Sequence, residues 1–177
     1  MSFASWLRSL RSRKATPSTH SLEIETYAVD YSAPRDEKDP LDYDDLVALD
    51  AEDLADQGIA GAYRELMPAL RKHVPEPVAV EEILDPDIGR YAVRFSGRTY
   101  LVYGPEISES DANSWGRATE VFFELVNSQL TESAVRFYAF YGGNDLSGMF
   151  LSPETAQQAC VALQRKSDRP YLPGRPE

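Results

Sequence analysis

The sequence predicts an α+β fold in which an antiparallel sheet built from hairpins carries helices packed on one face. Three observations lead to this prediction. Two pairs of segments with alternating apolar and polar residues flank glycine-containing turns, at 96–97 and 142–145. Apolar residues at helical spacing follow each pair, in 115–126 and 153–163. Because hairpins rather than strand–helix–strand crossovers dominate this order, we expect antiparallel strands.

Residues 1–20 are predicted to form a basic amphipathic start and a linker. Phe3, Trp6 and Leu10 have the spacing of one helix face, and four Arg and Lys side chains surround it. Pro17 lies among small polar residues, which favour no regular structure. We therefore expect a short helix followed by a linker.

Residues 21–168 are predicted to form a single α+β domain. Alternation over 22–27 predicts a half-exposed strand, and the prolines and charges of 32–42 predict a loop. Apolar residues from Leu46 to Val74 recur at helical spacing and predict two or three short helices. Pro68 predicts a kink near Met67 or a new helix that begins there.

The second half of this domain supplies the hairpins. Residues 78–83 predict a strand, and 91–95 pairs with 100–102 around Ser96-Gly97. Ser108 and Asp111 have the capping-box interval and introduce the helix of 115–126. The second hairpin joins 135–141 to 146–151.

The last predicted helix begins at Ser152-Pro153, because a serine oxygen can accept from free amides and proline suits the first helical position. Cys160 is expected on its inner face, as a small buried residue. The Pro-rich tail, 169–177, is expected to be extended or disordered.

The charge is concentrated in one segment. The chain carries 18 Lys and Arg against 29 Asp and Glu, a net charge of -11. Residues 21–60 alone hold thirteen acids and two bases. Such a balance repels nucleic-acid phosphates and anionic lipid, so we expect no nucleic-acid partner.

Cysteine usage and hydropathy indicate the compartment. A single cysteine excludes an intramolecular disulfide and a multi-thiolate metal site. No run approaches 18 apolar residues, and residues 1–14 lack the apolar stretch of a secretory signal. We therefore expect a cytoplasmic protein without stable membrane insertion.

No residue pattern predicts catalysis, a metal or a cofactor. His20 and His73 lack metal-ligand spacing, and neither Ser96 nor Ser147 has the Gly-x-Ser-x-Gly setting of a nucleophile. Paired acids at 81–82 and 85–87 are typical of an exposed strand end. We expect no enzymatic activity.

The acidic segment is the candidate functional site. Clustered carboxylates accelerate association with a cationic protein, and tyrosine rings supply rigid contact area. The alternative is a solvated surface without a partner. The predicted partner-binding residues are Asp36, Glu37, Asp39, Asp42, Tyr43, Asp44, Asp45, Asp50, Glu52 and Asp53.

A small, acidic α+β domain without a catalytic signature resembles the immunity proteins that bacteria make against their own toxins. The resemblance implies tight binding to a cognate toxin domain, often a basic nuclease, whose active site is blocked. One alternative is an adaptor or chaperone for an exported protein, which would use the aromatic strand around Phe137, Tyr138, Phe140 and Tyr141. A second alternative is an enzyme of unrecognised type.

Overall fold

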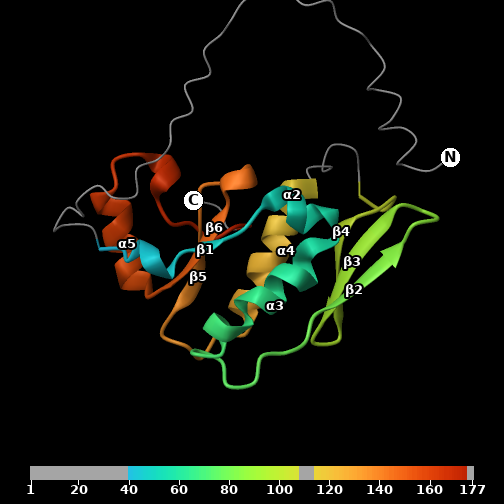
Figure 1. Cartoon of the computed structure of the whole chain (residues 1–177), viewed down its shortest axis with the longest axis horizontal. Coiled ribbons are helices and arrows are strands. Elements are labelled where there is room, and N and C mark those ends of the chain that lie inside the picture. Colours follow the sequence, from blue (N-terminus) through green and yellow to red (C-terminus); the bar gives the residue numbers. More distant parts are fainter. Residues whose placement is uncertain (1–39, 108–113, 175–177) are drawn as a thin grey trace, which may run out of the picture. The chain divides into compact units, whose positions relative to one another are not determined.

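The computed structural model describes residues 40–107 and 114–174 (Figure 1). The chain divides into units 1–34 and 35–177, and every described residue belongs to the second. The predictions for the basic start, for the strand in 22–27 and for the capping box at Ser108 lie outside the described residues. The α+β prediction is confirmed, since helices accompany two antiparallel sheets of three strands each.

Sheet II, as we call the sheet with the order β2-β3-β4, is the first predicted hairpin with one added strand. Its strands are β2 (Glu81–Asp85), β3 (Arg90–Phe95) and β4 (Arg98–Tyr103). Ser96 and Gly97 join β3 to β4 with φ angles of 49° and 75°. A two-residue hairpin loop requires this left-handed backbone, so the prediction from Ser96-Gly97 is confirmed.

Sheet I, with the order β1-β6-β5, contains the second predicted hairpin. Its strands are β1 (Val47–Ala48), β5 (Arg136–Phe140) and β6 (Ser147–Leu151). The turn between β5 and β6 contains the 3-10 helix η5 (Gly143–Asp145) and places Tyr141 and Gly143 at φ angles of 58° and 61°. Glycine tolerates that conformation without a side-chain clash, which explains Gly143, whereas Gly142 is extended with a φ of 176°.

The remaining elements are helical. They are η2 (Tyr43–Asp45), α2 (Ala51–Asp53), η3 (Leu54–Gly58), α3 (Ile59–Leu70), α4 (Ser114–Ser128), α5 (Pro153–Ala162) and η6 (Lys166–Asp168). Ser152 Oγ accepts a hydrogen bond from Thr155 N at 3.0 Å, as its predicted role as the N-cap of α5 requires. No helix among the described residues is both long enough and apolar enough to span a membrane.

Two details of the helical prediction are wrong. The residues after Leu46 form β1 instead of a helix, because Val47 and Ala48 pair with β6 and Leu49 N donates to Leu146 O at 2.8 Å. Pro68 lies inside α3 without breaking it, since the helix ends two residues later and loses only one backbone bond. The break lies instead in η3, where Gln57 has a φ of 73°.

Helix α4 lies between the two sheets and joins their apolar faces into one core (Figure 1). On one side, the ring of Phe123 stacks on Phe137 of β5, with 5.0 Å between the ring centroids. On the other side, Val93 and Phe95 of β3 belong to the same buried cluster as α4. The apolar stripe predicted within 115–126 is therefore buried against both sheets.

Sheet I is covered on both faces. Phe137 and Ala139 belong to the α4 core, whereas Phe140 lies in a second cluster with Met149 and with Ala156 and Ala159 of α5. Neighbouring residues of a strand face opposite sides, so the apolar run in β5 needs cover on each. The predicted packing of helices on one face is not confirmed, because α4 and α5 cover opposite faces of this sheet. The pattern along the sequence did not show which apolar residues belong to which cluster.

Residues 169–174 lie along the domain. Tyr171 and Ala139 exchange two backbone hydrogen bonds, of 2.8 and 2.9 Å, so the extended segment pairs with the outer edge of β5. Arg169 Nε donates to Leu163 O at 3.0 Å and holds the segment beside the end of α5. The predicted tail is extended around Tyr171, and a turn follows at Pro173 and Gly174, where Gly174 has a φ of 75°.

Gly148 tests the packing between sheet I and α4. A Cβ at this position would overlap the Phe137 ring, which is held by the aromatic cluster of α4. We expect Gly148→Ala to lower the free energy of unfolding by about 1–3 kcal/mol. Urea denaturation followed by circular dichroism measures this change.

Gly61 provides the matched control. A Cβ there meets no atom within 4 Å, and the residue lies inside α3. Gly61→Ala should therefore raise the free energy of unfolding by about 0.5–1 kcal/mol. Equal effects of the two substitutions would contradict the close approach of β6 to Phe137.

Candidate functional site

The structure divides the predicted partner-binding residues into three groups. Asp36, Glu37 and Asp39 lie outside the described residues. Asp42 and Asp50 cap the helical elements η2 and α2. The third group contains half-buried Tyr43 and the exposed acids that cap no helical element, Asp44, Asp45, Glu52 and Asp53, and we call these four acids the acidic surface.

The two capping aspartates determine the local backbone. Asp42 Oδ1 accepts from Asp44 N at 3.2 Å. Asp50 Oδ1 accepts from the N–H groups of Glu52 and Asp53, at 2.8 and 3.3 Å. These bonds satisfy amides that a helix start leaves free, so Asp42 and Asp50 are needed to form the surface as well as to charge it.

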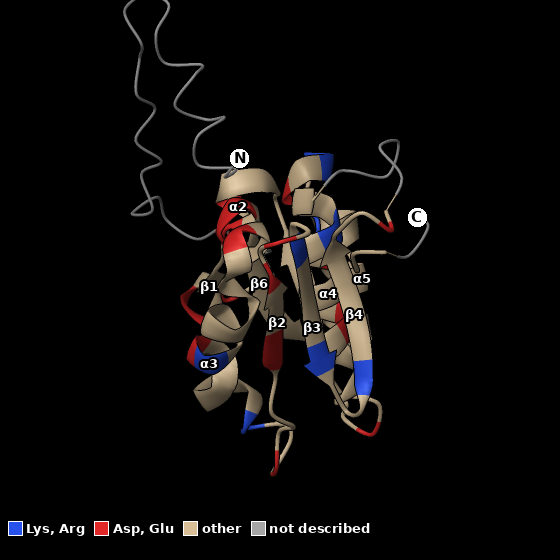
Figure 2. Cartoon of the chain, turned by 90° about the vertical axis from the view of Figure 1, so that its right-hand side faces the viewer, with Lys and Arg blue, Asp and Glu red and all other residues tan. Residues whose placement is uncertain are grey.

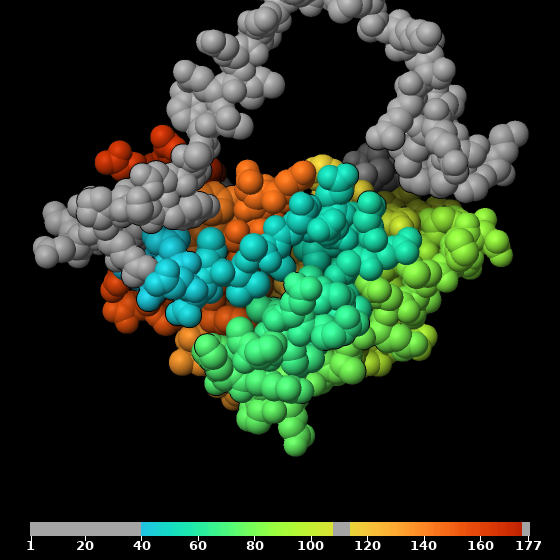
Figure 3. All heavy atoms as spheres, viewed as in Figure 1, coloured from blue at the N-terminus to red at the C-terminus, as the bar shows by residue number. Residues whose placement is uncertain are grey.

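Buried residues between the acids hold the segment in place. Leu41 lies in the second core cluster with Phe140, and Ala51 and Leu54 lie in the core with α4. The chain from η2 to α2 therefore runs as a continuous band across one face (Figure 3). The exposed carboxylates alternate with anchors, and their backbone positions are defined by the core.

No base offsets these acids within the segment. Residues 40–63 contain seven Asp and Glu and no Lys or Arg. Figure 2 shows acidic residues on α2, while Lys and Arg lie on other elements, among them β3 and β4. The segment from η2 to α2 therefore contributes negative charge that no basic residue of the same segment offsets.

Two aromatic residues, Tyr43 and Trp115, lie near this surface. Tyr43 is half-buried and packs against the second core cluster, so its ring supports η2. Trp115 is 40% exposed and lines a hollow of about 330 Å³ together with Ala51 of α2 and Tyr171. Trp115 begins the apolar pattern expected in 115–126, and only the fold shows that it lines a hollow together with Ala51 of α2.

A helix break separates the acidic surface from α3. Ile59 N donates to the Tyr91 hydroxyl at 3.3 Å, and Ala60 N donates to Glu82 Oε1 at 3.0 Å. The Tyr91 hydroxyl in turn donates to Glu82 Oε1 at 2.7 Å. A carboxylate and a phenol from sheet II therefore satisfy the amides that the new helix start exposes.

The fold raises the pKa values of three tyrosine hydroxyls. Burial raises the pKa of the Tyr91 hydroxyl above its usual value, and the hydrogen bond and the charge of Glu82 raise it further. Burial also raises the pKa values of Tyr63 and Tyr171. Each of these hydroxyls is held in its neutral form by the fold.

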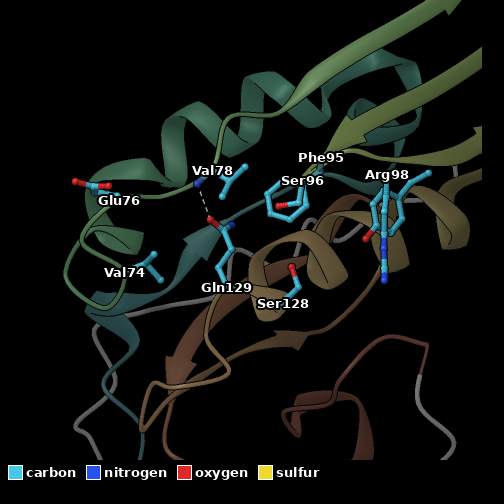
Figure 4. A pocket seen from close by; sticks show the side chains of 9 residues that line it. Val74, Glu76, Val78, Phe95, Ser96, Arg98, Ser128 and Gln129 are labelled. Atoms are coloured by element: carbon cyan, nitrogen blue, oxygen red, sulfur yellow. Dashed lines mark hydrogen bonds between the residues drawn. The ribbon is translucent and has the colours of Figure 1, made fainter.

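Another hollow lies between loop 74–78, the β3–β4 turn and the end of α4 (Figure 4). It has a volume of about 520 Å³ and is lined by Val74, Glu76, Val78, Phe95, Ser96, Arg98, Tyr100, Ser128 and Gln129. Glu76 and Arg98 lie at opposite ends of this lining.

The polar groups of that hollow serve the fold. Gln129 Oε1 accepts from Val78 N at 2.8 Å, and Gln129 Nε2 donates to the Tyr63 hydroxyl at 3.0 Å. Ser128 Oγ donates to Leu125 O at 2.9 Å. The lining includes no histidine or cysteine that could act as a base or nucleophile beside Ser96.

The other residues considered for chemistry also have structural contacts. His73 packs on the Phe150 ring at 4.7 Å, and Cys160, which is half-buried, donates to Pro170 O at 3.6 Å between sulfur and oxygen. Glu81 pairs with Arg94, and Glu82 caps α3. Among residues 40–107 and 114–174, no three His, Cys, Asp or Glu side chains are grouped to hold a metal ion.

Comparison of the chain with protein-family models, with curated proteins and with solved structures gives no match.

Tyr91→Phe tests the network at the start of α3. The substitution leaves Ile59 N–H without its acceptor and should lower the free energy of unfolding by about 1–2 kcal/mol at pH 7. Because the folded pKa of Tyr91 lies above the unfolded value of about 10, its stabilisation is complete below pH 10 and is lost as the pH rises further. The variant should therefore lose stability less steeply above pH 10.

Tyr100→Phe is the control, because no described residue forms a hydrogen bond with the Tyr100 hydroxyl. Urea denaturation of the wild type and both variants between pH 7 and about pH 11 separates the two effects. A Tyr91→Phe variant as stable as the wild type would show that the hydroxyl does not support the α3 start.

Proposed function

We propose that this chain is a non-catalytic binding protein whose acidic surface docks on a basic protein partner. The observation that carries the proposal is the arrangement of Asp44, Asp45, Glu52 and Asp53, which are exposed on a segment anchored by buried residues. A fixed group of like charges steers a cationic partner and selects its orientation. A mobile charged chain would give steering without a defined orientation.

The exposed ring beside α2 supports the same function. Interface energy comes mainly from a few well-packed residues, and tryptophan is the most frequent among them. Trp115 and the hollow that it lines offer such a contact next to the carboxylates. The acids would govern the rate of association and the ring would slow dissociation.

The resemblance to immunity proteins suggests what kind of protein the partner is. The partner would be a toxin domain of basic charge, and the acidic surface would cover its active site in the cytoplasm. Binding in a one-to-one complex without turnover is the activity that such a role requires.

The adaptor alternative finds no support in the aromatic strand on which it depends. Phe137 and Phe140 are fully buried, and Tyr138 packs in the second core cluster. Tyr141, at 37% exposure, is the most accessible of the four rings, so the strand does not present a continuous aromatic surface. The acidic surface is the better basis for a function.

Charge reversal tests the proposal. The partner is first captured with the full chain and identified by mass spectrometry, and its association rate is then measured at several salt concentrations. In the variant Asp44→Lys, Asp45→Lys, Asp53→Lys, we expect association at low salt to slow by about 10-fold or more and to depend less on salt. Neither capping aspartate is changed, so the local backbone should persist.

The control variant is Glu124→Lys, Glu132→Lys, Glu154→Lys, which alters the net charge equally at exposed positions on other elements. Equal rates for the two variants would attribute steering to net charge and would refute a specific acidic surface. Unchanged binding by the first variant would refute the proposed function directly.

A further inference from the structure

The outer edges of the two sheets are covered to different extents. On β5, Asn127 Oδ1 accepts from Phe137 N and Asn127 Nδ2 donates to Phe137 O, both at 2.9 Å. Tyr171 pairs with Ala139 on the same edge. A helix side chain and the extended segment therefore replace a neighbouring strand along β5.

Two other edge strands offer little room. β1 is only two residues long. On β4, Arg117 Nε of α4 donates to Leu101 O at 3.2 Å. Each of these edges is thus short or partly engaged.

The outer edge of β2 is open. β2 pairs with β3 in continuous register, from Glu81 opposite Arg94 to Asp85 opposite Arg90. In an antiparallel strand, alternate N–H and C=O groups point away from the partner. No residue of the described chain forms a hydrogen bond with that outer row of backbone groups on β2.

The side chains on β2 define what could pair with it. Glu82 and Leu84 lie opposite Val93 and Tyr91, which are core residues, so Glu81, Ile83 and Asp85 lie on the other face of the sheet. Leu84 is 47% exposed, and Ile88 after the strand is 52% exposed. An apolar centre between two carboxylates therefore borders the open edge.

The charges of this face leave one carboxylate without an ion pair. Arg94 pairs with Glu81 at 3.0 Å, and Arg90, opposite Asp85, pairs with Glu106 at 3.2 Å. Asp85 has no ion pair among the described residues. A basic side chain on an added strand would give Asp85 an ion pair as well.

A second copy of the chain does not complement the edge. Antiparallel pairing of two β2 strands about Ile83 would set Glu81 against Asp85 of the other copy, twice. Like charges directly opposite each other destabilise a strand pair, and acids on an edge are a common protection against self-association.

We propose that the outer edge of β2 binds an extended segment of a protein partner by strand addition. Basic side chains of that segment would lie opposite Glu81 and Asp85, and apolar side chains opposite Ile83 and Leu84. Backbone hydrogen bonds would supply affinity and the two charge pairs specificity. This site is independent of the acidic surface and goes beyond the proposed function.

A peptide with this pattern tests the site. The probe is acetyl-Ser-Lys-Val-Val-Thr-Lys-Ser-amide, added to the full chain labelled with ¹⁵N. We expect saturable shifts of amide resonances in β2 and slower hydrogen exchange of its outer N–H groups. A peptide with both lysines replaced by glutamate should bind about 10-fold more weakly, because two favourable pairs become repulsive.

Charge exchange makes the test specific. Asp85→Lys should lower the affinity for the lysine peptide and raise the affinity for the glutamate peptide. Asp87→Lys, in the turn that follows β2, should change neither affinity. Resonance shifts confined to residues outside sheet II, or no shifts at millimolar peptide concentration, would refute the proposal. Concentration-dependent shifts in β2 without peptide would identify a second copy as the occupant and would also refute it.

Discussion

The burial of α4 between two sheets is the constraint on which the described domain depends. Each three-stranded sheet has an apolar face that must be removed from water, and packing against a helix stabilises a small sheet. Phe122, Phe123 and their neighbours on α4 supply that cover for both sheets at once. The sheets therefore hold their positions through the helix, and the acidic surface, anchored through Ala51 and Leu54, depends on the same core.

The sequence predicted the parts of the fold that local chemistry determines. Gly97 and Gly143 favour their turns because few other residues tolerate a left-handed backbone, and Ser152-Pro153 specifies a helix start because its cap is local. β1 escaped prediction because a two-residue strand exists only through its pairing with β6. The division into two sheets and the second core cluster depend on contacts between distant segments, which no single pattern along the chain records.

The candidate site was predictable only as a charged segment. Composition identifies Asp42 and Asp50 along with Asp44 and Glu52, but hydrogen-bond geometry is needed to separate the caps from the outward carboxylates. The contribution of Trp115 depends on the approach of α4 to α2, and the open edge of β2 depends on which strands find neighbours. Accessibility is a property of the assembled domain, so residue type alone could not reveal it.

The side chain of Asn127 limits which residues can occupy its position. It donates to Phe123 O and Phe137 O and accepts from Phe137 N, so it needs an N–H group and a carbonyl on one short side chain. Aspartate would present a carboxylate to two carbonyl oxygens and could not donate to them. Asparagine thus supplies both a donor and an acceptor to Phe137, as a neighbouring strand would, and Asn127→Asp would replace two of these hydrogen bonds with repulsion.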